Sequence, residues 1–249
     1  MFEPWAEVLL DAVEISPGSR VLDIASGTGV VARAAARRAG GDGQVVASDV
    51  SGPMLARSAA VGARSGAARI EYREAAADAL PFEDGSFDVV LCQQGLQFFR
   101  ARAVAVGEMR RVLRRGGVAG VAVWAEGHPL DPFGVYADEL AATGAEPPFP
   151  RAFESETFTI GLETIRSLLH EAGFSPVDAE VVELQVSWPD AAAAAAGVLG
   201  TPFGPLVHAL SPSQRNRFEA ALDKRFAPEE QGAPVRRPTA AVIARATAA

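Results

Sequence analysis

Residues 21–29 read Val21-Leu22-Asp23-Ile24-Ala25-Ser26-Gly27-Thr28-Gly29, a short apolar run that ends in a Gly-x-Gly turn. The apolar run, taken from Arg20 to Ala25, predicts a buried strand. The residues that follow, Thr28 to Arg38, are rich in alanine and arginine and predict a helix that stops at Gly40-Gly41. A strand that leads through glycines into a helix places backbone N–H groups against a ligand, with no Cβ in the way. The segment therefore predicts a ligand-binding turn.

Strands and helices continue to alternate along the rest of the chain. Further strands are expected at 44–48, 69–73, 87–92, 117–124, 177–188 and 239–246, and further helices at 4–14, 52–66, 101–115 and 162–172. Strands separated by helices of about ten to fifteen residues are typical of βαβ units. The sequence thus predicts an α/β fold with a seven-stranded, mostly parallel sheet, whose final strand pairs antiparallel with the strand before it.

Two segments depart from this alternation and are interpreted as helical insertions after the fifth and sixth strands. The first, at about 126–160, is rich in proline, glycine and aromatic residues, and the second, at about 189–231, begins with the alanine run of 191–196. Because no repeat and no linker-like stretch separates them from the rest, residues 1–249 are predicted to form a single domain. The two insertions are expected to form a cap over the substrate.

Composition narrows the class of protein. The net charge of −8 disfavours binding to nucleic acid, whose phosphates an acidic surface repels. The single cysteine, Cys92, excludes an internal disulfide and leaves too few thiols for a structural zinc site, so no metal is expected. The longest apolar run, 118–124, is too short to span a membrane, and no signal peptide is recognised. A cytoplasmic protein is expected, and the sequence leaves a homodimer open.

Two carboxylates refine the prediction for the Gly-x-Gly turn. Asp23 stands four residues before Gly27, at the carboxyl edge of the first strand, where it suits an ammonium group and would repel a pyrophosphate. Asp49 ends the second strand, at the position where a carboxylate accepts hydrogen bonds from both ribose hydroxyls. Together they suit a nucleoside that carries a cationic amino-acid tail. The alternative is a dinucleotide site, because Gly27, Gly29 and Ala32 also satisfy the looser dinucleotide fingerprint.

The chain resembles the class I S-adenosylmethionine-dependent methyltransferases, in the branch of the ubiquinone/menaquinone-type enzymes (methyltransferase type 11). The matching blocks keep the order and spacing of that family over roughly residues 1–125, and the likeness of residues 126–249 is looser. These blocks are Val21 to Gly29, Asp49-Val50-Ser51 with Met54-Leu55, Ala79-Leu80-Pro81-Phe82 with Gly85 to Val90, and Arg111 to Gly117.

The resemblance implies a Rossmann-like sandwich, the cofactor S-adenosyl-L-methionine, the product S-adenosyl-L-homocysteine and a set of residues around them. It implies that Ala25, Ser26 and Gly27 wrap the methionine moiety, with Asp23 near its ammonium group. It also implies that Asp49 holds the ribose while Val50 and Met54 flank the adenine. The remaining cofactor contacts that it implies are Ala76, Ala77 and Asp78 at the adenine edge, and Cys92, Gln93 and Gln97 near the sulfonium.

The sequence departs from the family pattern at two places. The family usually has aspartate where this chain has Ala76, so Asp78 or backbone groups are expected to read the adenine. The family also usually begins with a few dozen residues that fold over the cofactor, whereas this sequence has almost none before Pro4. Either the sequence starts late, or the lid is built elsewhere, in which case the two insertions are the candidates for it.

The expected reaction is methyl transfer to an O, N or C atom of a small acceptor molecule. Since the sulfonium methyl is already activated, the protein mainly aligns the reactants and excludes water. The acceptor pocket is predicted to be apolar or aromatic, with a lining of Trp5, Phe98, Phe99, Trp124, Phe133 and Tyr136. His128 follows the fifth strand and is the candidate general base, and its alternative role is that of a structural loop residue.

Two other functions stay open on the sequence alone. One is a nicotinamide-dependent oxidoreductase, which the pattern Gly-x-Gly-x-x-Ala favours and which Asp23 disfavours. The other is a protein that binds S-adenosylmethionine without transferring its methyl group, either as a scaffold or as a catalyst of another reaction. Ala76 and the short amino end keep this second alternative open.

Overall fold

The computed structural model describes residues 1–128, 133–144, 158–201, 203–227 and 233–249. The chain divides into two compact units, which we describe separately. The sheet unit comprises Phe2–Glu126, Ile160–Val182 and Ala241–Ala249. The insertion unit comprises Gly127–Thr159 and Glu183–Ala240, together with Met1. Both predicted insertions fall largely within the insertion unit, and parts of each lie outside the described residues.

The sheet has seven strands in the order β3-β2-β1-β4-β5-β7-β6. Strands β1 to β5 are parallel to one another, and β7 is antiparallel to β5. The strands are β1 (Arg20–Ile24), β2 (Gln44–Asp49), β3 (Arg69–Glu74), β4 (Phe87–Gln93), β5 (Leu113–Trp124), β6 (Phe174–Trp188) and β7 (Val235–Ala248). This topology confirms the predicted α/β fold with a mostly parallel sheet and an antiparallel final strand.

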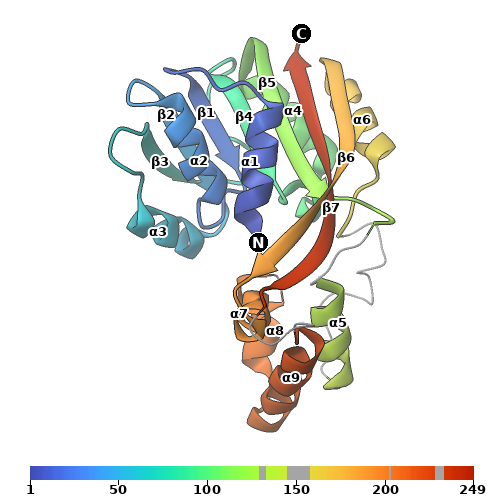
Figure 1. Ribbon diagram of the computed structural model, residues 1–249. Helices are drawn as coiled ribbons and strands as arrows, with labels where there is room; N and C mark the ends of the chain where they lie inside the picture. Colours follow the sequence, from blue (N-terminus) through green and yellow to red (C-terminus); the bar gives the residue numbers. More distant parts are fainter. Residues whose placement is uncertain (129–132, 145–157, 202, 228–232) are drawn as a thin grey trace. The chain divides into compact units, whose positions relative to one another are not determined.

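Helices cover both faces of the sheet (Figure 1). On one face, α1 and α2 pack against each other, and on the other face α4 packs against α6. The strands beneath them are apolar on both sides, as expected for a covered parallel sheet, and Val21, Leu22 and Val90 have no exposed surface. The helices are α1 (Phe2–Ala12), α2 (Val30–Ala39), α3 (Gly52–Val61), α4 (Arg102–Val112) and α6 (Leu162–Glu171), with the short 3-10 helix η1 (Leu96–Phe98) after β4.

The insertion unit contains a second, aromatic core. Tyr136 packs against Phe133 and Phe226 with ring-centroid distances of 6.3 and 5.6 Å, and its hydroxyl donates to the backbone carbonyl of Ala194 at 2.5 Å. Its helices are α5 (Phe133–Ala142), α7 (Ala191–Ala196), α8 (Gly204–Ala209) and α9 (Pro212–Arg225), with the 3-10 helix η3 (Gly197–Gly200). Strand β6 begins in the sheet unit and ends in the insertion unit, whereas β7 begins in the insertion unit and ends in the sheet unit.

Two predicted helices are shorter in the structure. Helix α3 ends at Val61, where Gly62 adopts a positive φ of 66°. The helix predicted over 101–115 ends at Val112, and Leu113 already belongs to β5 because it pairs with Phe87 of β4. The predicted end of this helix at residue 115 is therefore wrong, and Arg114 and Arg115 lie in β5.

Arg111, in the last turn of α4, has a structural role that its sequence position did not indicate. Its guanidinium donates to the backbone carbonyls of Leu80 and Phe82 at 2.9 and 2.7 Å, and it pairs with Asp84 and Glu108 at 2.8 and 2.6 Å. One side chain thus holds the loop that precedes β4.

No helix in the described part of the chain combines the length and the apolarity that crossing a membrane requires.

Candidate functional site

The order of the sheet reverses between β1 and β4, because the chain proceeds outward from β1 through β2 to β3 and then returns to β4 on the other side. In open parallel sheets, such a switch point separates the loops at the carboxyl ends of the two central strands and creates a crevice for ligands. Here the loops that flank the switch point begin at Ala25, after β1, and at Gln94, after β4. The candidate site therefore comprises these two loops and the loop after β2.

The turn after β1 has an unusual backbone. Ala25 and Gly27 have φ values of 54° and 53°, and Gly29, which caps α2, has a φ of 80°. Residues with a Cβ rarely adopt such values, and non-glycine examples cluster at functional sites. A Cβ on Gly29 would lie 1.9 Å from Oγ of Ser58, so the turn packs tightly against α3. Position 29 therefore requires glycine, both because its φ is positive and because Ser58 leaves no space for a Cβ.

Asp49 fixes the turn from the end of β2. Its Oδ2 accepts the backbone N–H of Gly27 at 2.8 Å, and its Oδ1 accepts the backbone N–H of Ser51 at 2.9 Å. The residue is only 8% exposed. A carboxylate offers about four acceptor sites, so each oxygen of Asp49 retains a lone pair after these two bonds. The spacing predicted from the sequence therefore brings this carboxylate directly to the glycine turn, with acceptor capacity left over.

Asp23 is completely buried at the end of β1. Neither carboxylate oxygen has a hydrogen-bond partner of regular geometry among the described residues. Burial raises the pKa of the Asp23 carboxyl well above its usual value, and the nearby Asp49 carboxylate raises it further, while the backbone N–H of Ala32 and the charge of Arg33 act in the opposite direction. A buried carboxyl group without partners is costly, and a cationic ligand group would relieve that cost.

Other buried polar atoms that lack partners in the described part of the chain gather in the same region. They lie in β2, in α3 beside Gly29, at the end of β4, and in the segments that follow β1 and β4. Buried polar groups are hydrogen-bonded in most proteins, so a concentration of unsatisfied groups indicates a place where a ligand or water completes the bonding. Besides Asp23, the residues are Ser26, Ser48, Ser58, Gln93, Gln94 and Gln97.

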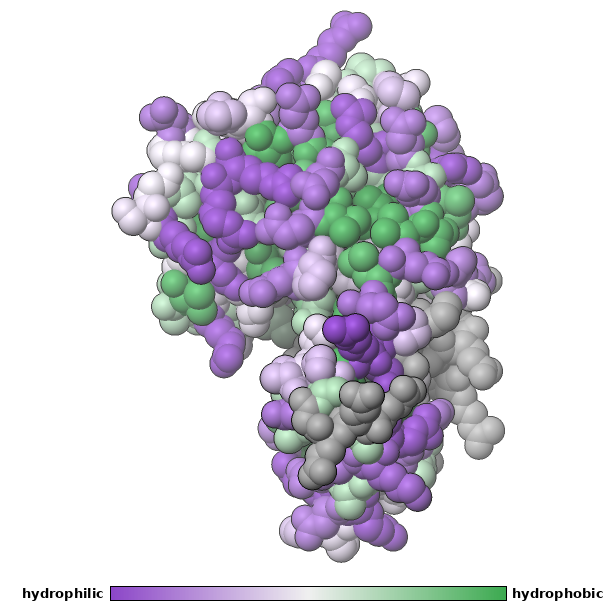
Figure 2. Space-filling view, viewed as in Figure 1, coloured by the Kyte–Doolittle hydropathy of each residue, from purple (hydrophilic) through white to green (hydrophobic). Residues whose placement is uncertain are grey.

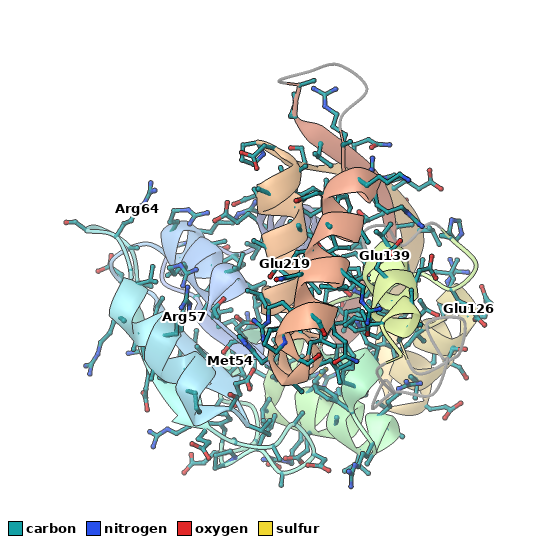
Figure 3. The ribbon with its side chains drawn as sticks, turned by 90° about the horizontal axis from the view of Figure 1, so that it is seen from below. Met54, Arg57, Arg64, Glu126, Glu139 and Glu219 are labelled. Carbon is teal, nitrogen blue, oxygen red and sulfur yellow. The ribbon has the colours of Figure 1, made fainter. Side chains whose placement is uncertain are left out.

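Apolar side chains lie at the surface beside the glycine turn. Val50 is 68% exposed and Met54 is 47% exposed, and Sδ of Met54 lies 3.8 Å from the position that a Cβ on Gly27 would occupy. Figure 2 shows apolar surface over α3. Figure 3 shows Met54 and Arg57 on the same side of this helix, as their spacing of three residues requires. Exposed apolar side chains next to Asp49 can contact a flat heterocycle.

The loop after β3 supplies the third edge of the region. The backbone N–H of Ala75 donates to the carbonyl of Asp49 at 3.1 Å, which ties this loop to the end of β2. Ala76 and Ala77 are half-buried and Asp78 is exposed. The structure thus ties the loop that carries these three residues to the carboxyl end of β2.

The carboxyl end of β4 contributes an amide-rich loop. Cys92 is fully buried, and burial raises the pKa of its thiol to about 12. The side-chain amide of Gln93 donates to the backbone carbonyl of Phe2 at 3.2 Å, and that of Gln97 donates to Oε1 of Gln94 at 3.3 Å. Gln94 was not among the predicted site residues, yet it is buried and has a φ of 55°. Only its place directly after a buried strand could have singled it out.

The aromatic residues predicted to line an acceptor pocket divide between the two units. In the sheet unit, Trp5 and Trp124 are buried and pack edge to face at 5.8 Å, whereas Phe98 is 41% exposed and Phe99 is half-buried. In the insertion unit, Phe133 and Tyr136 belong to the aromatic core. One pocket lined by all of these residues therefore remains a prediction.

His128 lies in the insertion unit, with Nδ1 3.4 Å from Oε1 of Glu183. The side chain is 37% exposed. A surface pairing of this kind fits a structural residue as well as a base, so its predicted role stays a prediction. In the described residues, no group of three or more His, Cys, Asp or Glu side chains is placed to hold a metal ion.

Comparison with known proteins identifies the family. Residues 22–121 match the methyltransferase domain family. The ubiquinone/menaquinone biosynthesis C-methyltransferase of Xylella fastidiosa (strain M12) is 38% identical over 119 residues, which is 47% of this chain and 47% of that protein. The matches thus span about half the length of such relatives.

Solved structures agree on the fold. A putative methyltransferase from Bacillus halodurans C-125 superposes with a TM-score of 0.62 at 20% identity and covers 98% of both chains. The cyclase SpnF also gives a TM-score of 0.62 at 20% identity, covering 98% of this chain and 80% of its own. The sequence resemblance noted above is therefore confirmed. Residues 22–121 match the methyltransferase domain family and are similar to the ubiquinone/menaquinone-type enzymes among the class I S-adenosylmethionine-dependent methyltransferases.

Proposed function

We propose that this protein binds S-adenosylmethionine at the carboxyl ends of β1, β2 and β4 and transfers its methyl group to a small acceptor molecule. The observation that carries the proposal is the concentration of unsatisfied buried polar atoms around a strained glycine turn at the switch point of the sheet. The match to the methyltransferase domain family supports the same reading. The match covers about half of the relatives' length, and the acceptor is therefore proposed only as a class.

The residues of the site fit the parts of this cofactor. Asp49 retains lone pairs for two ribose hydroxyls, and the turn at Ala25, Ser26 and Gly27 presents backbone groups to the methionine moiety. Asp23 offers a buried negative charge to the ammonium group, which would satisfy its unpartnered oxygens. Gly29 keeps the turn close to α3.

The adenine is assigned to the apolar surface beside Asp49. Val50 and Met54 are exposed there and would be covered by a flat heterocycle, which accounts for their exposure. The stretch Ala76-Ala77-Asp78 would meet the adenine edge, with backbone groups of the loop in place of the aspartate that the family usually has. Cys92, Gln93 and Gln97 are assigned to the region of the sulfonium.

When bound, the cofactor supplies a methyl group that is already activated by the positive charge on sulfur. The chain's own residues then align the acceptor and keep water away. In the sheet unit, Phe98 and Phe99 are the proposed acceptor contacts. Trp5 and Trp124 are buried in the core of the same unit, where they pack edge to face. Such side chains favour an apolar or aromatic acceptor, methylated on O, N or C. Phe133, Tyr136, His128 and the idea of a cap remain predictions.

Equilibrium binding tests the proposal directly. S-adenosylhomocysteine is expected to bind the protein in isothermal titration calorimetry, with a stoichiometry of about one, whereas NAD is expected not to bind. Release of S-adenosylhomocysteine in the presence of phenols, amines or other small acceptors would then establish transfer. Binding of NAD in place of the adenosyl compound would overturn the assignment. Tight cofactor binding with no turnover on any acceptor would favour the alternative without methyl transfer.

The pH dependence of binding tests the role of Asp23. In the free protein, burial raises the pKa of Asp23, and an ammonium partner would lower that pKa again. Binding should therefore release a proton, and the affinity for S-adenosylhomocysteine should rise with pH until the pH exceeds the raised pKa. Calorimetry in buffers of different ionisation enthalpy would detect the released proton. In the variant Asp23→Asn, the affinity should be lower and the proton release should disappear.

The pH dependence of stability tests the raised pKa of Asp23 in the absence of ligand. A raised pKa in the folded state means that the folded chain holds more protons than the unfolded chain above the usual carboxyl pKa. The contribution of Asp23 to stability is therefore greatest at low pH and declines as the pH rises through the raised value. Denaturation of Asp23→Asn should show a stability gain over the original protein that increases from pH 4 upward. A gain that is independent of pH would contradict this assignment.

A further inference from the structure

Two buried glutamines at the end of β4 have hydrogen-bonding capacity that the fold does not use. Gln94 is 9% exposed and Gln97 is 1% exposed. Nε2 of Gln97 donates to Oε1 of Gln94 at 3.3 Å, so the two amides form a pair. Nε2 of Gln94 and Oε1 of Gln97 have no hydrogen-bond partner among the described residues. The pair therefore presents one donor group and one acceptor.

This inventory does not depend on which way the amides are turned. If the oxygen and nitrogen of both amides were exchanged, Nε2 of Gln94 would donate to Gln97 and leave one acceptor on Gln94 and one donor group on Gln97. In either orientation, the pair is complementary to a neutral group that both accepts and donates a hydrogen bond. Such groups are hydroxyls and primary amides.

The pair lies beside the proposed cofactor turn. A Cβ on Gly95 would come within 2.5 Å of Cβ of Ala25 and within 3.5 Å of Cζ of Phe99, so the loop after β4 abuts both the turn after β1 and an aromatic ring. Ala25 and Gln94 are the two non-glycine residues with positive φ in the described chain. Two strained turns in contact at the switch point indicate a functional constraint on both.

The surroundings favour a neutral ligand over a charged one. The pair itself carries no charge, and a buried charged ligand group needs a countercharge at hydrogen-bond distance. The guanidinium of Arg102 donates to the backbone carbonyl of Gln97 at 2.8 Å and so fixes the loop. This leaves the two side-chain amides to receive the ligand.

We propose that Gln94 and Gln97 determine acceptor specificity by binding a neutral hydroxyl or primary amide on the methyl acceptor. This inference rests on the proposed function, because it takes the neighbouring turn as the cofactor site. A hydroxyl placed here would accept from the amide nitrogen of one glutamine and donate to the amide oxygen of the other. The ring of Phe99 would lie against the apolar part of the same molecule.

Binding of simple probes tests the proposal. With S-adenosylhomocysteine bound, the affinities of phenol, benzamide, anisole and benzoate would be measured by ligand-observed NMR titration. Phenol or benzamide should bind at least about tenfold more tightly than anisole, which cannot donate, and than benzoate, which is charged. Which of the two binds better distinguishes a hydroxyl from an amide acceptor. In Gln94→Met the preference over anisole should disappear, while the affinity for S-adenosylhomocysteine should change less than about threefold.

Matched variants keep the outcomes distinct. Gln44→Met makes the same change at an exposed glutamine and should leave every affinity unchanged. Circular dichroism should show that Gln94→Met remains folded, because methionine keeps the length and approximate volume of the buried glutamine. Equal binding of phenol and anisole, strongest binding of benzoate, or no probe binding to the loaded protein would each overturn the inference. A tenfold loss of S-adenosylhomocysteine affinity in Gln94→Met would show that the amide contacts the cofactor instead. Failure of the original protein to bind S-adenosylhomocysteine would instead overturn the proposed function.

Discussion

Replacement of Asp49 by alanine is expected to lower the affinity for S-adenosylhomocysteine by at least about 100-fold. Two hydrogen bonds from ribose hydroxyls to a carboxylate contribute roughly 1.5–3 kcal/mol each, and about 1.4 kcal/mol corresponds to a factor of ten. The change also removes the acceptors of the Gly27 and Ser51 N–H groups, which hold the turn at 2.8 and 2.9 Å. The variant therefore loses both the proposed ribose contacts and the hydrogen bonds that position the turn. Calorimetric titration measures the effect.

Two further variants separate these contributions. Asp49→Asn keeps one acceptor oxygen and should give an intermediate loss. Asp42→Ala removes an exposed carboxylate from the loop before β2 and should not change the affinity, so it controls for the reduced net charge. The assignment of the ribose to Asp49 fails if Asp49→Ala remains folded, by circular dichroism, and binds S-adenosylhomocysteine as tightly as Asp42→Ala does.

Replacement of Gly29 by alanine is expected to lower the free energy of unfolding by about 2–5 kcal/mol. A left-handed backbone costs a residue with a Cβ roughly 1–2 kcal/mol, and forcing an extra methyl group into packed structure costs about 1–3 kcal/mol more. Gly29 has a φ of 80°, and a Cβ there would lie 1.9 Å from Oγ and 3.1 Å from Cβ of Ser58. Urea denaturation of the two proteins measures the difference.

Gly18 provides the matched control for this change. It has a φ of 83° in the turn closed by the Ser19 N–H and the Ser16 carbonyl, and a Cβ there would meet nothing within 4 Å. Gly18→Ala should therefore cost only the backbone contribution of roughly 1–2 kcal/mol. The second change Ser58→Ala should recover part of the loss in Gly29→Ala, since it removes the nearest atom. Equal losses in Gly29→Ala and Gly18→Ala would show that the contact with α3 is unimportant.

The fold was predictable because its main signals are local. The apolar run at 20–25 and the glycines after it define β1 and the start of α2 without reference to the rest of the chain. The boundary at Leu113 was not predictable in this way. Arginine and leucine are good helix formers, so the sequence predicts that α4 continues through residue 115. Pairing of Leu113 with Phe87 instead places Leu113 in β5. Tertiary contact overrides local preference there.

The site was predictable only where spacing along the chain fixes spatial position. Asp49 and Gly27 stand at the carboxyl ends of neighbouring strands, and in the structure they share a hydrogen bond. Gln94 was missed because its burial and its positive φ arise from the contact between two loops that are distant in sequence. The aromatic residues at 124 and 136 were grouped by their order along the chain, yet they belong to the cores of different units.

The buried thiol of Cys92 makes the chain suitable for site-specific labelling. Alkylating reagents react with the thiolate form of cysteine. The Cys92 thiol is buried, and its raised pKa keeps it protonated near neutral pH. Maleimide dyes should therefore leave it unmodified in the native protein and react only with cysteines introduced at exposed positions. Val61 of the sheet unit and Leu199 of the insertion unit are 63% and 48% exposed. A fluorophore pair on Val61→Cys and Leu199→Cys would report, by energy transfer, any movement of one unit with respect to the other when S-adenosylhomocysteine is added.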